Sequence, residues 1–258
     1  MGWVGKLIGG TIGLGLGGPL GAILGAAIGH KFDKSEDKYL EGFGGRPSYA
    51  SNNFEAKQQK EMIFFVAAFS MLAKIAKADG QISDSEIQAV EDFMNNDLKL
   101  DSSSKAAAIN IFRAARHSSE SFESFSRQFY EAFKDQEQIL ELMIDVLFRV
   151  ASSDGSIILD EEILIKNTSA LFGFSDAKFN SIKSKYAKVN SNHYYAVLNC
   201  SPSDDPAYIK KQYRKLVSEY HPDKIIAKGL PDEFVEFANE KFREIQEAYE
   251  AVSRQKNL

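Results

Sequence analysis

The chain is poor in the residues that build disulfides and metal sites. Of its 258 residues only Cys200 is a cysteine, so no intrachain disulfide can form, which suits a reducing compartment. No pair of its four histidines has metal-ligand spacing, and we expect no cofactor. No recognisable set of nucleophile, base and orienting residue is present, so we do not expect an enzyme. The formal net charge of −5 argues against general binding of nucleic acid.

Charge is also missing from one long stretch near the N-terminus. Residues 7–28 contain no charged side chain, and as a helix they would rise about 33 Å, enough to cross a bilayer core. We predict a transmembrane helix within residues 1–30, with a kink at Pro19. The alternatives are a cleavable signal peptide and a glycine-rich tail that does not insert. The span is followed by three lysines, which favours a cytoplasmic location for the C-terminal side.

Glycine recurs at every fourth position of this segment. On a helix these glycines would line one face without side chains, which allows a second helix to approach closely in lipid. The sequence therefore predicts a packing face for self-association of the transmembrane helix as a homodimer. The glycines are Gly5, Gly9, Gly13, Gly17, Gly21, Gly25 and Gly29.

The middle of the chain is rich in helical periodicity. Residues 31–53 form a spacer with glycine, serine, asparagine and proline towards its end, and residues 54–188 read as an all-helical domain. We predict helices at 61–78, 85–95, 103–116, 121–133, 136–152, 161–171 and 176–186.

An internal repeat lies within this helical domain. Residues 76–82 and Glu86 match residues 151–157 and Glu161 at an offset of 75 positions. Each copy ends a long helix, turns at Asp-Gly and starts another helix. The string matches the second half of an EF-hand loop, but the first half lacks the carboxylates that calcium needs. The paired repeat instead resembles the TerB-like helical domain of tellurite-resistance proteins.

Four carboxylates of the repeat have two interpretations. They could meet in space and hold a metal ion, or they could satisfy backbone N–H groups at the starts of helices, which is the more common role of such residues. They are Asp79, Glu86, Asp154 and Glu161.

The tripeptide His221-Pro222-Asp223 stands between two helical patterns near the C-terminus. Apolar residues at helical spacing precede it over 207–220 and follow it over 234–252. Because proline disfavours helical geometry in the residue before it, the first helix should end near His221. We therefore predict that the tripeptide lies on a loop at the tip of a helical hairpin.

This region resembles the J domain of the DnaJ family, which activates Hsp70. Residues 194–198, 209–216 and 241–250 resemble its three helices, in register with the His-Pro-Asp motif. The resemblance implies that the motif contacts Hsp70 and that the ATP chemistry belongs to Hsp70. The predicted core of this domain is Tyr195, Leu198, Ile209, Leu216, Phe242, Ile245 and Tyr249.

A cationic strip accompanies the motif. Four basic residues and no acid lie between positions 206 and 218, at spacings that place them opposite the apolar stripe. Such a strip steers an acidic protein partner, although most charged helix faces are simply solvated. The strip consists of Lys210, Lys211, Arg214 and Lys215.

The order of the parts resembles membrane-anchored DnaJ-like proteins of Gram-negative bacteria. The string 227–231 (Ala-Lys-Gly-Leu-Pro), shortly after the motif, is similar to that family's version of the loop. The predicted fold is all-α, with a transmembrane helix, a TerB-like helical bundle and a J-domain hairpin at 192–258. The resemblance implies an inner-membrane co-chaperone that stimulates cytoplasmic Hsp70 (DnaK). The alternative function is a TerB-like metal or envelope-stress sensor or scaffold that recruits Hsp70 secondarily.

Overall fold

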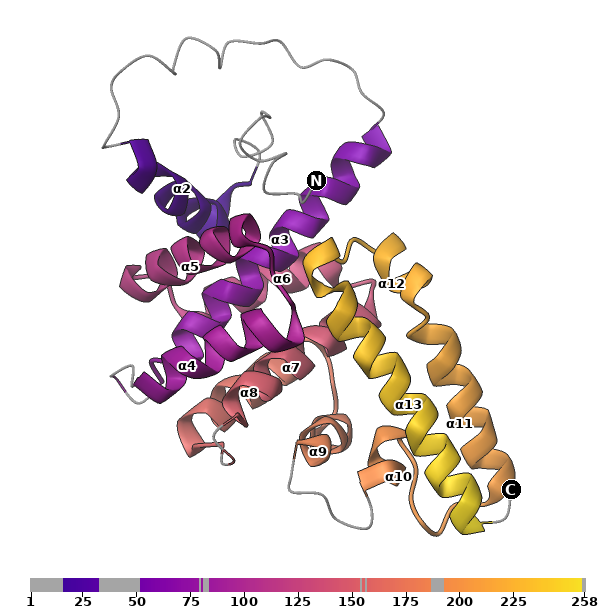
Figure 1. Ribbon diagram of the computed structural model, residues 1–258. Coiled ribbons are helices and arrows are strands. Elements are labelled where there is room, and N and C mark those ends of the chain that lie inside the picture. Colours follow the sequence, from indigo (N-terminus) through magenta and orange to yellow (C-terminus); the bar gives the residue numbers. More distant parts are fainter. Residues whose placement is uncertain are drawn as a thin grey trace.

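The computed structural model describes residues 16–32, 52–78, 80, 84–153, 155, 157–186 and 193–256, and within these ranges every regular element is a helix (Figure 1). The prediction of an all-α chain is therefore confirmed for the described residues. In chain order the elements are α2 (Gly18–Phe32), α3 (Asn52–Ile75), α4 (Asp84–Asp92), the π-helical turn η3 (Phe93–Asp97), α5 (Ser102–His117), α6 (Phe122–Phe133), α7 (Glu137–Ala151), α8 (Leu159–Leu171), α9 (Asp176–Lys185), α10 (His193–Val197), α11 (Pro206–Glu219), α12 (Pro222–Ala227), the 3₁₀ turn η4 (Asp232–Phe234) and α13 (Val235–Lys256).

The helices predicted for the middle domain are all present, with ends shifted by a few residues. Side-chain caps fix several of these ends: Asp101 accepts hydrogen bonds from two backbone N–H groups of α5, and Ser121 and Ser175 cap α6 and α9. The largest difference is α3, which begins at Asn52, inside the predicted spacer.

The main core is built around α3, which contacts α5, α6 and α7 along its length. Every side chain of α3 from Met62 to Ala73 is buried, as expected of a helix covered on all sides. Phenylalanines dominate this core, and Phe64 contacts Phe129 edge to face with ring centroids 5.6 Å apart.

The N-terminal apolar segment is helical only from Gly18 onward in its described part. Pro19 lies in the first turn of α2, where proline is well tolerated, so the predicted kink at this residue is wrong. Leu20 and Ile23 are buried in the main core, and the side chain of Gln128 holds the start of α2 by accepting from the Leu20 N–H (2.9 Å) and donating to the Gly17 carbonyl (2.6 Å). Among the described helices none is long and apolar enough to cross a membrane. The remainder of the predicted span, with Gly5, Gly9 and Gly13, lies outside the described residues.

The C-terminal part contains a helical hairpin in which α11 and α13 lie side by side, with α12 at the turn between them (Figure 1). A second, smaller core holds it together and contains five of the predicted core residues, Tyr195, Leu198, Ile209, Leu216 and Ile245. The other two predicted core residues are half-buried. Tyr249 stacks on Tyr213 with ring centroids 3.9 Å apart, and Phe242 packs edge to face with His221.

The η4 turn and the first turn of α13 belong to the main core and not to the hairpin. Phe234 is fully buried, and its ring centroid lies 4.8 Å from that of Phe64 and 6.3 Å from that of Phe93. Phe237 also contacts Phe93, at 5.7 Å. The apolar stripe predicted over 234–252 is thus divided between two cores, because the C-terminal part folds against the middle domain over a shared core.

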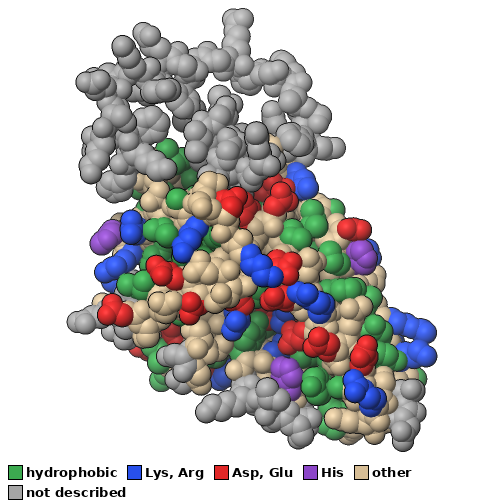
Figure 2. Space-filling model, viewed as in Figure 1, with side chains coloured by type: hydrophobic (Ala, Val, Ile, Leu, Met, Phe, Trp, Pro, Cys, Tyr) green, Lys and Arg blue, Asp and Glu red, His purple; other side chains and the backbone are tan. Residues whose placement is uncertain are grey.

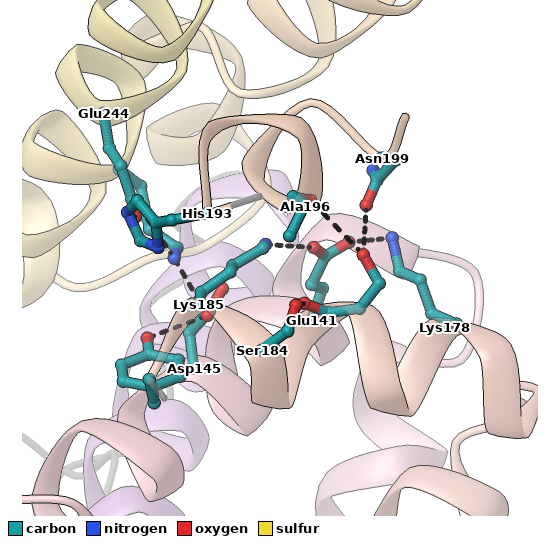
Figure 3. A network of polar contacts seen from close by, with 12 residues as sticks. Glu141, Asp145, Lys178, Ser184, Lys185, His193, Ala196, Asn199 and Glu244 are labelled. Carbon is teal, nitrogen blue, oxygen red and sulfur yellow. Dashed lines mark hydrogen bonds and ion pairs between the residues drawn. The ribbon is translucent and has the colours of Figure 1, made fainter. Parts of the chain in front are cut away.

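A buried polar network also joins the two parts (Figure 3). On α7 of the middle domain, Asp145 accepts from the Tyr186 hydroxyl (2.8 Å) and pairs with Lys241 of α13 (2.9 Å). One turn earlier, Glu141 pairs with Lys178 (2.5 Å) and with Lys185 (3.4 Å). Burial alone would raise the pKa of Glu141, but the two lysines lower it to about 2, so this carboxyl group stays ionised.

Candidate partner-docking surface

The cationic strip lies on the exposed side of α11. Asp205 caps this helix by accepting from the Tyr208 N–H (2.9 Å), and Pro206 occupies its first turn. Lys210, Lys211 and Arg214 are exposed, and within the described part of the chain they have no carboxylate within 4.0 Å.

The fourth member of the strip, Lys215, lies 3.9 Å from Glu219. The blue side chains at the right-hand edge of Figure 2 lie over α11 as it is drawn in Figure 1. The helix therefore presents positive charge to solvent, on the side away from the middle domain.

The His-Pro-Asp motif follows the end of α11, and it begins a helix instead of lying on a loop. His221 is the N-cap of α12, and its Nδ1 accepts from the Asp223 N–H (3.3 Å). Pro222 and Asp223 are the first two residues of α12, because proline lacks an N–H and its fixed φ suits the first helical position. The predicted loop is thus corrected to a helix start.

The two polar side chains of the motif remain accessible. The His221 side chain is 49% exposed and that of Asp223 is 89% exposed, with His221 Nδ1 and Asp223 Oδ2 3.8 Å apart. Lys224 donates to the Ser218 hydroxyl (2.8 Å), which links α12 back to the last turn of α11. The charged side chains of the strip and the polar side chains of the motif are thus exposed on two consecutive helices, and together they are defined as the docking surface: residues 210, 211, 214, 215 and 221–223.

The repeat carboxylates are only partly within the described residues, because Asp79 and Asp154 lie outside them. Glu86 and Glu161 line one cavity of about 40 Å³, to which both copies of the repeat contribute. Glu161 accepts from the Ile158 N–H (3.1 Å), so it caps the start of α8 as the second interpretation predicts. In the described ranges, no group of three or more His, Cys, Asp or Glu side chains is arranged to hold a metal ion.

Sequence reasoning missed the contact between the segment after the His-Pro-Asp motif and the middle domain. The signal was present as Ile225, Leu230 and Phe234, three large apolar residues that follow the motif within a short distance. At the turn of an isolated two-helix hairpin these side chains would be exposed to solvent. In the structure all three are fully buried in the main core.

Three family models match the chain in succession. Residues 1–48 match the co-chaperone DjlA transmembrane domain, residues 65–184 match the tellurite resistance protein TerB, and residues 193–257 match the DnaJ domain.

Curated relatives match over nearly the whole length. The chain is 29% identical to the co-chaperone protein DjlA of Escherichia coli O157:H7 over 252 aligned positions, covering 89% of each protein. It is 28% identical to the protein of the same name from Photobacterium profundum, covering 98% of the chain and 99% of the relative. It is 29% identical to that from Coxiella burnetii, covering 100% of both. No solved structure matches the chain.

Proposed function

This chain belongs to the DjlA family of co-chaperones, and from that premise we propose that it stimulates ATP hydrolysis and client capture by the cytoplasmic Hsp70, DnaK. The observation that carries the proposal is the docking surface, in which an exposed His-Pro-Asp motif starts a helix beside an exposed cationic strip.

The docking surface supports a division of roles. Lys210, Lys211 and Arg214 attract an acidic face of ATP-bound DnaK and orient it, because exposed charges act mainly on the rate and geometry of encounter. Asp223 then contacts a basic group of DnaK, and His221 supplies the second polar contact. Pro222 keeps both side chains at the start of α12. Binding biases DnaK towards the conformation that hydrolyses ATP, so the chemistry belongs to DnaK and this chain is not itself an enzyme.

The N-terminal segment supports an anchor in the bacterial inner membrane. Residues 1–48 match a transmembrane family model, and the lysines after the apolar segment favour cytoplasmic placement of the middle and C-terminal parts. The repeated glycines provide a face for a homodimer. Such a glycine face would let two helices approach closely in lipid.

Single-turnover ATP hydrolysis by DnaK tests the proposal. The full chain in lipid nanodiscs should accelerate hydrolysis, and His221→Gln should abolish the acceleration while leaving the helical content unchanged. His117→Gln is the matched control, because His117 is an exposed histidine on α5, outside the docking surface. Normal stimulation by His221→Gln would refute the proposed role of the motif.

A further inference from the structure

The helix that starts with Pro222 and Asp223 is too short to be stable alone. α12 has six residues, and isolated helices shorter than about 12 residues are marginal in water. Something outside α12 must therefore hold it folded, and the hairpin's own core does not. Ile225, the buried residue of α12, belongs to the main core of the middle domain and is 1% exposed.

The segment after α12 continues into the middle domain. Leu230 is 0% exposed and also lies in the main core, four residues before Phe234. These three apolar side chains and Phe237 enter the same core, whereas the buried residues of α11 enter the hairpin core. The His-Pro-Asp motif thus lies between α11, whose buried side chains pack in the hairpin core, and α12, whose buried side chain packs in the main core.

Gly229 lies close against Lys60 of α3. A Cβ added to Gly229 would lie 2.7 Å from the Cβ of Lys60 on α3, a distance that real Cβ atoms essentially never show. Because Lys60 Cβ is attached directly to the helix backbone, it cannot rotate out of the way. Gly229 also has a φ of +94°, in the region that favours glycine.

Polar contacts surround the site where Gly229 packs against Lys60. With the side-chain amide of Gln136 oriented so that both bonds form, its oxygen accepts from Lys60 Nζ (2.6 Å) and its nitrogen donates to the Lys228 carbonyl (2.7 Å). The Lys228 ammonium also donates to the Gln138 side chain at the start of α7. Residues of α3 and α7 therefore hold the segment after α12 by both its backbone and its side chains.

We propose that the middle domain is a seat that keeps the His-Pro-Asp motif in its docking conformation, with Gly229 as a positioning residue for Hsp70 stimulation. The seat consists of the surfaces of α3 and α7 that receive residues 225–230. Burial of Ile225 and Leu230 in the main core keeps α12 folded. The folded α12 then presents Asp223 in its first turn, with His221 as its N-cap. The inference rests on the proposed function, because it assigns the TerB-like domain a part in the same docking event.

The test is Gly229→Ala in the full chain in nanodiscs. The added methyl group clashes with Lys60, so residues 225–230 should be packed against α3 and α7 in only a fraction of the molecules. Apparent affinity falls in proportion to the fraction of the competent state, so the concentration for half-maximal stimulation of DnaK should rise about tenfold. The maximal stimulation at saturation should be retained.

The distance between α12 and the middle domain can be measured in the absence of DnaK. Spin labels on Ala227→Cys and Asn167→Cys, in a Cys200→Ser background, join exposed sites on α12 and α8. The wild-type background should give one narrow distance distribution, and Gly229→Ala should broaden it while the circular dichroism stays helical.

Matched variants separate the effect of the clash with Lys60 from the effect of placing alanine at a positive φ. Gly173→Ala introduces the same kind of backbone strain, at φ +81°, where an added Cβ meets no atom within 4 Å, and it should change neither readout. Lys60→Gly combined with Gly229→Ala removes the clashing Cβ and should partly restore the narrow distribution. If Gly229→Ala does not fold, Ile225→Val should give a smaller shift in the same direction.

The outcomes distinguish the two proposals. An unchanged distance distribution and unchanged half-maximal concentration in Gly229→Ala would overturn the seat. A wild-type chain that fails to stimulate DnaK would overturn the proposed function, while the distance measurement would still decide whether the seat exists.

Discussion

Replacing Lys241 by methionine removes a buried positive charge from the contact between the hairpin and the middle domain. The Lys241 side chain is 10% exposed, and its ammonium lies 2.9 Å from Asp145 and 3.0 Å from Glu244. Burial lowers the pKa of Lys241, but the neighbouring negative charges raise it well above its ordinary value, so the group is charged. Among the described residues, Lys241→Met leaves the fully buried Asp145 with the Tyr186 hydroxyl as its one hydrogen-bond donor.

The expected cost follows from the burial of the partner that remains. Breaking a buried pair by removing one member costs about 3–5 kcal/mol, because the remaining charge is desolvated and unpaired. Asp145→Asn should cost less, because Lys241 keeps Glu244 and the new amide oxygen can still accept from Tyr186. The double variant should cost less than Lys241→Met alone, since it leaves no unpaired charge on α7.

Urea unfolding followed by circular dichroism measures these costs as changes in the free energy of unfolding. Each variant is compared at the same detergent concentration, and the denaturant slope is checked for constancy. A cost below about 1 kcal/mol for Lys241→Met, or a double variant whose cost equals the sum of the two single costs, would refute the reasoning.

Two further predictions concern charge. The folded-state pKa of Glu141 is lowered from 4.5 to about 2, so its stabilising effect is present above pH 4.5 and should be lost as the pH falls towards 2. The loss should be about 3 kcal/mol in urea unfolding, and Glu141→Gln should lack this part of the pH dependence. In the cationic strip, Lys211→Glu should slow association with ATP-bound DnaK about tenfold at low salt and less at high salt, as stopped-flow fluorescence would measure. Arg113→Glu, at an exposed site on α5, is the control, and an equal effect of both variants would argue against specific steering.

Much of the helical fold could be predicted because each helix carries its own periodicity and end signals. The helices predicted at 121–133 and 176–186 are present, and Ser121 and Ser175, residues of a type that commonly marks helix starts, cap them in the structure. The smaller core was also predictable, because Ile209 and Leu216 lie at helical spacing on α11 and Ile245 belongs to the apolar stripe of α13.

The division between the two cores could not be predicted from periodicity. Phe234 and Phe237 continue the stripe of α13 in sequence, yet the helix passes from one core to the other, and spacing alone does not reveal which partner a side chain meets. For the docking surface, the exposed residues follow from the motif and the charge pattern. The start of α12 could not be predicted in this way. A six-residue helix is too short to show a periodic pattern, and it depends on tertiary contacts.

The most direct test of the docking surface is hydrogen exchange of the full chain with and without ATP-bound DnaK. We predict slower exchange in α11 and α12, at residues 206–227, on addition of ATP-bound DnaK, and no such change with His221→Gln. Exchange that slows only in α4 and α8 of the middle domain, or that changes equally in the wild type and His221→Gln, would contradict the account.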